Sequence, residues 1–123
     1  MSQDIIADTL NQIMNAKKAK KPEITVKKHS KFLISLLDLM KRLGYVSYKI
    51  KGKELFIEIK KINDCRAIKP RFNVSFDDID RHIKGLLPSR DFGFVIISTS
   101  KGLMTHTEAI EKNIGGSLIA YVY

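Results

Sequence analysis

The sequence lacks the features that mark secreted and membrane-spanning proteins. It has a single cysteine, Cys65, so no disulfide can form within the chain, as is expected in a reducing compartment. No apolar run approaches the roughly 20 residues that a helix needs to cross a bilayer. The N-terminal stretch MSQDIIAD is acidic, unlike a secretory signal or an Arg-rich transit peptide. We therefore expect a soluble, cytosolic protein.

Residue patterns for catalysis and metal binding are also missing. The sequence contains neither a P-loop nor a Gly-x-Ser-x-Gly nucleophile elbow. His29, His82 and His106 have no paired cysteine and no histidine four residues away, so we expect surface or capping histidines. The acids between Asp77 and Asp80 lack the glycine and the closing glutamate of a calcium loop. We expect no enzyme activity, no cofactor and no metal.

Positive charge, by contrast, is abundant and unevenly placed. Lys and Arg number 22 against 13 Asp and Glu, which gives a formal net charge of +9. Such an excess favours a polyanionic partner, because each neutralised phosphate releases condensed counterions. Seven lysines lie close together, at positions 17, 18, 20, 21, 27, 28 and 31. A lysine run is more often only a solvated surface, and sequence alone leaves this alternative open for any single run.

The first part of the chain is predicted to form two helices with a strand between them. Helical apolar spacing after Asp4, a good N-cap, predicts a helix over residues 5–16. Pro22 then opens a short strand. Ser30 is suited to cap a second helix, which runs to residue 43 and ends at Gly44.

Strands predominate after the second helix. Residues 46–50 and 55–59 alternate in polarity, and the Gly-first turn Gly52-Lys53 between them predicts a hairpin. The first half of the chain is therefore ordered helix, strand, helix, strand, strand. Farther on, the run 92–97 is nearly all apolar, which is typical of a buried strand, and residues 118–123 form a last strand.

Residues 67–74 and two short helices complete the second half. In 67–74, Pro70 implies an edge strand or a bulge, and Lys69 and Arg71 lie on the face opposite the apolar residues. Asp77 is expected to cap one short helix, which Gly85 and Pro88 end, and Thr105 with Glu108 has capping-box spacing for another to about residue 113. The sequence predicts an α+β fold.

The segment Ser98, Thr99, Ser100, Lys101 and Gly102 is the strongest candidate for a binding loop. It leaves an apolar strand and precedes the N-terminus of a predicted helix, where free N–H groups favour anions. Three hydroxyls suit phosphate oxygens, ribose 2′-OH groups and base edges alike, and the lysine adds charge. The same residues also suit a tight turn that binds nothing, and both alternatives stay open at this point.

Four blocks of the sequence resemble the signature blocks of the ribosomal protein eight family. They are IADTLNQIMNA (6–16), RAIKPRFNV (66–74), LPSRDFGFVIISTSKGLMTHTEA (87–109) and GGSLIAY (115–121), in that order. The segments IKPRF and LPSRDFG resemble the archaeal and eukaryotic cytosolic branch of the family more than the bacterial branch. The similarity covers nearly the whole chain, and the STSKG-to-GG stretch is its most specific part.

The resemblance implies two small lobes that together hold a helix of the central domain of small-subunit rRNA. They would be an N-terminal α/β lobe at 1–64 and a mostly β, RNA-binding lobe at 65–123. The serine-threonine loop, here Ser98 to Gly102, would enter the RNA groove. Further RNA contacts are expected at first-lobe positions and on the strand before residue 74, namely Ser30, Lys31, Lys17, Lys18, Lys20, Lys21, Lys69 and Arg71.

Two consequences follow for function. The resemblance implies a structural protein that acts early in small-subunit assembly and contacts neighbouring ribosomal proteins, with no small-molecule substrate. Thr107 and Ile110 stand where basic residues are frequent in the family, so the helix after the loop is expected to make fewer phosphate contacts. The rival hypothesis is a free-standing nucleic-acid-binding regulatory module, which would not co-sediment with small subunits.

Overall fold

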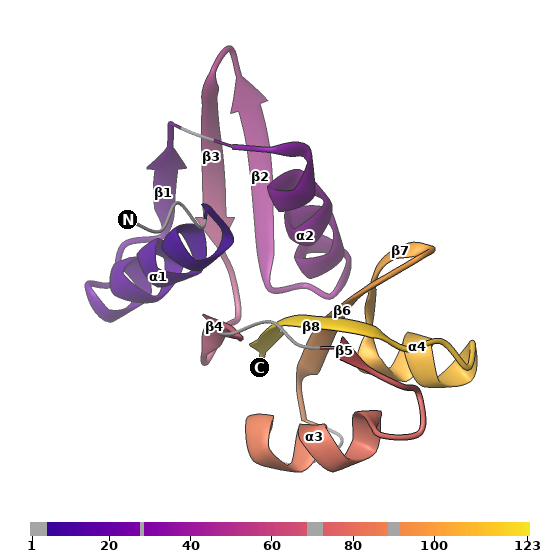
Figure 1. The fold of residues 1–123 in the computed structure, drawn as a ribbon. Helices are drawn as coiled ribbons and strands as arrows, with labels where there is room; N and C mark the ends of the chain where they lie inside the picture. Colours follow the sequence, from indigo (N-terminus) through magenta and orange to yellow (C-terminus); the bar gives the residue numbers. More distant parts are fainter. Residues whose placement is uncertain (1–4, 28, 69–72, 89–91) are drawn as a thin grey trace. The chain divides into compact units, whose positions relative to one another are not determined.

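A computed structural model of the protein describes residues 5–27, 29–68, 73–88 and 92–123. The chain divides into two compact units, a first unit that ends at Ile62 and a second unit from Asn63 to Tyr123. Within these described ranges each unit contains one antiparallel sheet accompanied by two helices, so the prediction of an α+β fold is confirmed (Figure 1).

The first unit has the predicted order helix, strand, helix, strand, strand. Its elements are α1 (Ile5–Lys18), β1 (Glu23–Val26), α2 (Lys31–Arg42), β2 (Val46–Lys51) and β3 (Glu54–Ile59). The strands pair antiparallel in the order β1-β3-β2. Gly52, with φ of +61°, begins the turn between β2 and β3, as the Gly-first hairpin motif requires. The predicted cap Asp4 lies outside the described residues.

The core of the first unit lies between the two helices and one face of the sheet. The predicted stripe of α2 is confirmed, because its four main apolar residues are fully buried. On β3, Leu55 and Ile57 are buried whereas Glu54 and Glu58 are exposed, so only one face of the sheet is covered. The buried stripe consists of Leu33, Leu36, Leu37 and Met40.

The second unit is mostly β. It contains β4 (Cys65–Ala67), β5 (Asn73–Val74), α3 (Ile79–Leu86), β6 (Phe94–Thr99), β7 (Gly102–Thr105), α4 (His106–Glu111) and β8 (Gly116–Val122). The sheet order is β4-β8-β6-β7, and β5 also pairs with β8. The last strand in sequence is thus an inner strand, with β6 on one side and both β4 and β5 on the other (Figure 1).

The structure differs from the sequence predictions at residues 67–74 and at the start of α3. Residues 67–74 are not one strand, because β4 and β5 form separate short pairings with β8, and 69–72 lie outside the described residues. The residue at the N-cap of α3 is Asp78 rather than Asp77. Its carboxylate bonds to no helix N–H but accepts from Ser75 Oγ at 3.1 Å and from Arg81 Nη2 at 2.7 Å.

His106 is buried, which corrects the expectation of a surface histidine. Its side chain lies at the start of α4 with 2% relative exposure, and its Nδ1 accepts the backbone N–H of Val95 at 3.1 Å. The imidazole completes the hydrogen bonding of β6 beyond Ile96, where the pairing with β7 ends. The polar residues on both sides of His106 had indicated an exposed side chain. The side chain is buried instead, and it accepts a hydrogen bond from the backbone N–H of Val95 on β6.

Candidate nucleic-acid interface

The predicted binding loop forms the tip of the hairpin between β6 and β7. Ser98 and Thr99 end β6, Ser100 and Lys101 form the turn, and Gly102 begins β7 with φ of +106°. Ser100 and Lys101 are exposed, so the turn presents a hydroxyl and an ammonium to solvent. A two-residue turn of this kind holds its side chains at one end of a paired ladder, which fixes their direction.

The Thr99 hydroxyl is used inside the turn. Its Oγ1 donates to the carbonyl oxygen of Gly102 at 2.9 Å and accepts the backbone N–H of Lys101 at 3.1 Å. A hydroxyl has one proton to donate, and Thr99 has already given it to the backbone. Thr99 therefore shapes the turn, whereas the hydroxyls of Ser98 and Ser100 make no bond to other described residues.

The sheet extends the hydroxyl loop sideways into a row of polar side chains. Ser98 on β6 faces Ser117 on β8, and Ser117 in turn faces Asn73 on β5. The Ser117 hydroxyl donates to Asn73 Oδ1. Directly paired residues of neighbouring strands point to the same side of a sheet, so the three polar groups share one face. We call Asn73, Ser117 and Ser98 the polar row.

Sequence reasoning missed Ser117 and Asn73, although a signal was present. Two glycines, Gly115 and Gly116, precede Ser117, and neither has room for a side chain. A Cβ at Gly116 would lie 2.2 Å from the carbonyl oxygen of Ser98, and one at Gly115 would lie 2.3 Å from that of Val74. The glycine pair thus allows β8 to approach both neighbouring strands closely, which places Ser117 between its two partners.

One part of the sequence argument is wrong. The loop was expected to precede a helix N-terminus, but β7 separates the turn from α4. The N-terminal N–H groups of α4 therefore do not belong to the turn. Thr105 caps that helix as predicted, since its Oγ1 accepts the N–H of Glu108 at 3.3 Å. Anion binding at the turn has to come from Lys101, the hydroxyls and the backbone of the hairpin.

In the first unit, Ser30 and Lys31 lie at the N-terminus of α2. Ser30 Oγ accepts the N–H of Leu33 at 3.2 Å, so the predicted cap is confirmed, and its hydroxyl proton stays free to donate. Both residues line an open hollow of about 530 Å³. Its other lining residues are His29, Ile34, Ser35 and Ile50, and Ile50 is 46% exposed, which is unusual for an isoleucine.

The lysines at the end of α1 lie at the surface. Lys17 and Lys18 form the last turn of the helix, and Lys20 and Lys21 follow it, with only Lys17 partly covered. Cations at this position also complement the helix dipole, so their placement has a structural benefit besides any binding. They lie before β1, whereas Ser30 and Lys31 follow it, so the first-unit candidates form two separate groups.

Lys20 has a backbone conformation that is unfavourable for lysine. Its φ is +60°, and its N–H bonds to the carbonyl of Lys17 while that of Lys21 bonds to Ala16, at 3.0 and 2.8 Å. This is a Schellman motif, whose left-handed position is usually occupied by glycine. The corresponding residues after α2 and α4 are Gly44 and Asn113, which adopt this conformation more readily.

Lys69 and Arg71 lie outside the described residues, as does Lys28. Within the described ranges no three His, Cys, Asp or Glu side chains are grouped to hold a metal ion. None of the helices over those ranges is long and apolar enough to cross a membrane.

Comparison with known proteins assigns the chain to a family. The family model described as ribosomal protein S8 matches residues 4–123. The small ribosomal subunit protein uS8 of Nanoarchaeum equitans is 41% identical over the full length of both chains. The uS8B protein of Candida albicans is 37% identical and the uS8A protein of Saccharomyces cerevisiae 36%, each over 97% of this chain and 96% of the relative.

Proposed function

The chain belongs to the ribosomal protein S8 family, and we propose that it holds a helix of the central domain of small-subunit rRNA and promotes early assembly of the subunit. As a member of this family it is a structural component of the small ribosomal subunit and not an enzyme, and its partners are rRNA and other ribosomal proteins. The proposal concerns which rRNA helix is bound, by which residues, and when.

The observation that carries the proposal is the polar row beside the hairpin turn. Asn73, Ser117 and Ser98 offer an amide and two hydroxyls on one face of a rigid sheet, and Ser100 and Lys101 project from its end. Double-stranded RNA is recognised by contacts to 2′-OH and phosphate groups across a wide, shallow minor groove. Hydroxyls and amides both donate and accept, so they suit the 2′-OH, while Lys101 neutralises a phosphate.

In the mechanism we propose, one set of residues recognises the shape of the RNA and another set neutralises its phosphate charge. The second unit inserts the hairpin turn into the groove, where the polar row contacts 2′-OH groups. Lys17, Lys18, Lys20 and Lys21 neutralise phosphates and set the affinity, and Ser30 with Lys31 supplies a separate contact at the start of α2. Lys69 and Arg71 remain proposed contacts from the sequence alone. We retain 1–64 and 65–123 as the proposed first and second RNA-holding lobes.

The backbone conformation of Lys20 supports a role of this residue in RNA binding rather than in folding. A left-handed conformation costs an L-residue other than glycine or asparagine roughly 1–2 kcal/mol. Lys20 adopts it although Gly44 and Asn113 occupy the same place in the equivalent motifs. Residues in unfavourable backbone conformations often serve function, and here the side chain adds a charge next to Lys17, Lys18 and Lys21.

The test is binding of the purified chain to a central-domain rRNA hairpin and to a scrambled duplex of equal length, near physiological salt. We expect a preference of about a hundredfold for the hairpin, or about 2.7 kcal/mol. Replacing Ser98 and Ser117 together by Ala should remove much of this preference, whereas Ser47→Ala, a hydroxyl deletion in the first unit, should not. Equal affinity of the unchanged protein for both RNAs would contradict the proposal.

A further inference from the structure

Among the described residues of the first unit, no helix covers one of the two faces of the sheet, which we call the uncovered face. On this face, side chains alternate with the buried ones, so that Glu23 of β1, Lys49 of β2 and Glu58 of β3 are exposed while Phe56 and Ser47 are partly exposed. α1 and α2 contribute their apolar stripes to the opposite face, together with Leu55 and Ile57. The proposed RNA contacts do not include any residue of this surface.

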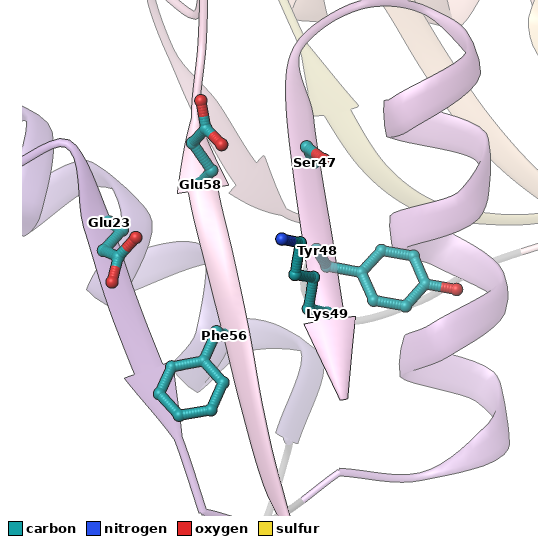
Figure 2. Close-up of a pocket in the computed structure, with 6 residues that line it drawn as sticks. All are labelled: Glu23, Ser47, Tyr48, Lys49, Phe56 and Glu58. Atoms are coloured by element: carbon teal, nitrogen blue, oxygen red, sulfur yellow. The ribbon is translucent and has the colours of Figure 1, made fainter. Parts of the chain in front are cut away.

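A shallow hollow of about 90 Å³ lies on the uncovered face. Figure 2 shows Glu23, Phe56, Glu58 and Lys49 around it, from all three strands of the sheet. Tyr48 also lines the hollow, but its ring points toward α2, where its hydroxyl donates to Asp38. Phe56 is therefore the one aromatic ring among the lining residues that stands on the uncovered face.

The hollow brings two acidic side chains together in a protein of formal net charge +9. Glu23 and Glu58 are direct Cα partners across β1 and β3. Like charges in directly paired positions destabilise a sheet, because the Cβ atoms lie only about 4.5–5.5 Å apart. Among the described residues neither glutamate forms an ion pair, and Lys49, the one cation lining the hollow, can balance one of them only.

We propose that this face binds an arginine side chain from a basic segment of a neighbouring ribosomal protein. The guanidinium would lie between the carboxylates of Glu23 and Glu58, and the aliphatic stem of the arginine would pack on Phe56. This surface is distinct from the proposed rRNA contacts and does not depend on them.

Charge and shape both favour a protein over RNA and arginine over lysine. Phosphates would be repelled by two unpaired carboxylates, whereas a cationic side chain removes their mutual repulsion. A planar guanidinium presents donors on two sides and can bond two carboxylates at once, while an ammonium acts as a point charge. The ring of Phe56 accepts a cation nearby as well, since Lys51 Nζ lies 6.0 Å from its centroid on the side of the hairpin turn.

The test uses the full ¹⁵N-labelled chain and two probes, the peptide acetyl-Gly-Ser-Arg-Ser-Gly-amide and its lysine equivalent. Titration at low salt should shift the amide signals of Ser47, Phe56 and Glu58, and more strongly with the arginine peptide. Glu23→Gln and Glu58→Gln should each weaken binding by up to about fivefold, the upper end of the contribution of an exposed ion pair. Lys49→Gln should strengthen binding, because it removes a competing cation.

Glu54→Gln is the matched control. Glu54 lies on the same face of the same strand and loses the same charge, but it is paired across the strands with Lys51 and does not line the hollow. An equal loss of affinity in Glu54→Gln and Glu58→Gln would mean general charge attraction only and would overturn the proposal. The proposal would also be overturned if the rRNA hairpin, and not the peptide, shifted the amide signals of Ser47 and Glu58. Glu23→Gln and Glu58→Gln should leave affinity for the rRNA hairpin unchanged, so the two proposals fail separately.

Discussion

At the scale of single residues, the site depends on atoms that the sequence does not mark as polar or reactive. Gly116 is the clearest case, because it allows the β8 backbone to approach that of β6 and so aligns Ser117 with Ser98. The serines supply the chemistry, but the glycine determines where they stand. Thr99 has a similar supporting role, since its hydroxyl closes the turn that presents Ser100 and Lys101.

Gly116→Ala should therefore destabilise the second unit. The new Cβ would lie 2.2 Å from the Ser98 carbonyl oxygen, a contact that backbone atoms have to move to relieve. We expect a loss of about 1–3 kcal/mol in the free energy of unfolding, measured by urea denaturation. Gly85→Ala is the control, because nothing lies within 4 Å of its Cβ position and it is helical, so it should stabilise or be neutral. Equal effects of the two variants would contradict this account.

Tyr48 provides a prediction about pH. Its hydrogen bond to Asp38, together with partial burial and the charge of that carboxylate, raises its pKa above the ordinary value of 10.0. A raised pKa in the folded state means that the stability from this bond is fully present below pH 10 and is lost as the pH rises through the folded-state pKa. Asp38→Ala should lower the Tyr48 pKa toward 10.0, as followed by NMR titration of the ring.

Tyr45 serves as the internal reference in that titration. Its pKa is also raised, but by burial alone, and it makes no contact with Asp38 that enters this shift. It should keep its raised pKa in the Asp38→Ala variant. A Tyr48 pKa that does not change would show that the hydrogen bond to Asp38 is not maintained in solution.

At the scale of secondary-structure elements, the molecule uses the same helix ending three times with three different residues. Lys20, Gly44 and Asn113 occupy the left-handed position after α1, α2 and α4, each with the same pair of backbone hydrogen bonds. Glycine and asparagine are expected there, whereas lysine is not. The comparison within one chain isolates what the lysine side chain costs and suggests an experiment that separates folding from binding.

Lys20→Gly should raise stability and weaken RNA binding at the same time. Relief of the left-handed conformation should add about 0.5–1 kcal/mol to the free energy of unfolding. Removal of one phosphate-neutralising charge should reduce the slope of log affinity against log salt by about 0.7–0.9. Lys18→Gln, which removes a charge within the helix, should reduce the slope without the gain in stability. If the Lys20→Gly variant bound RNA with an unchanged slope of log affinity against log salt, Lys20 would contact no phosphate and would face solvent only.

The elements also show where sequence reasoning succeeded. Both helices of the first unit, the hairpin at Gly52 and the cap at Ser30 follow from local signals, namely apolar spacing, a Gly-first turn and a hydroxyl before an apolar stripe. Each of these signals lies within a few consecutive residues, so the sequence alone is enough to recognise it. The chain does turn at the predicted hydroxyl segment, at Ser100 and Lys101 between β6 and β7, while the role of Ser98 to Gly102 in binding stays a prediction.

Predictions failed where the structure depends on strand pairing between distant residues. The pairing of Asn73 with Ser117, 44 residues apart, brings two members of the polar row together, and no local pattern contains it. His106 was expected to be a surface or capping histidine because its neighbours in sequence are polar, but its side chain is buried and accepts the N–H of Val95 on β6. The strand β7 was overlooked because Gly102 to Thr105 is too short for alternation to be visible.

At the scale of the whole molecule, we expect the net positive charge to set how strongly the protein binds RNA. The formal net charge is +9, and the four lysines 17, 18, 20 and 21 carry a large share of it at one end of α1. Replacing these four by Gln should weaken binding to hairpin and scrambled RNA alike. The salt slope should fall by about 0.7–0.9 for each phosphate that is no longer neutralised, measured by affinity at several salt concentrations.

Substitutions in the polar row should change the preference for the hairpin and not the salt dependence of binding. Ser98→Ala with Ser117→Ala removes no charge, so the salt slope should stay as it is while the preference for the hairpin falls. A quadruple lysine variant with an unchanged slope, or a serine variant that loses affinity for both RNAs equally, would show that the roles are not divided as proposed.

The central position of β8 has a consequence for how the protein is made. β8 is synthesised after β4, β5 and β6, yet all three pair with it. A nascent chain that has reached Lys112 contains β4 and β5 but no strand for them to join, so the sheet of the second unit closes only after residues 116–122 emerge. The polar row crosses the sheet through Ser117 and forms at that same moment. An unfinished polypeptide that stops before residue 116 therefore lacks the row, and we expect it to lack the proposed RNA surface of the second unit as well.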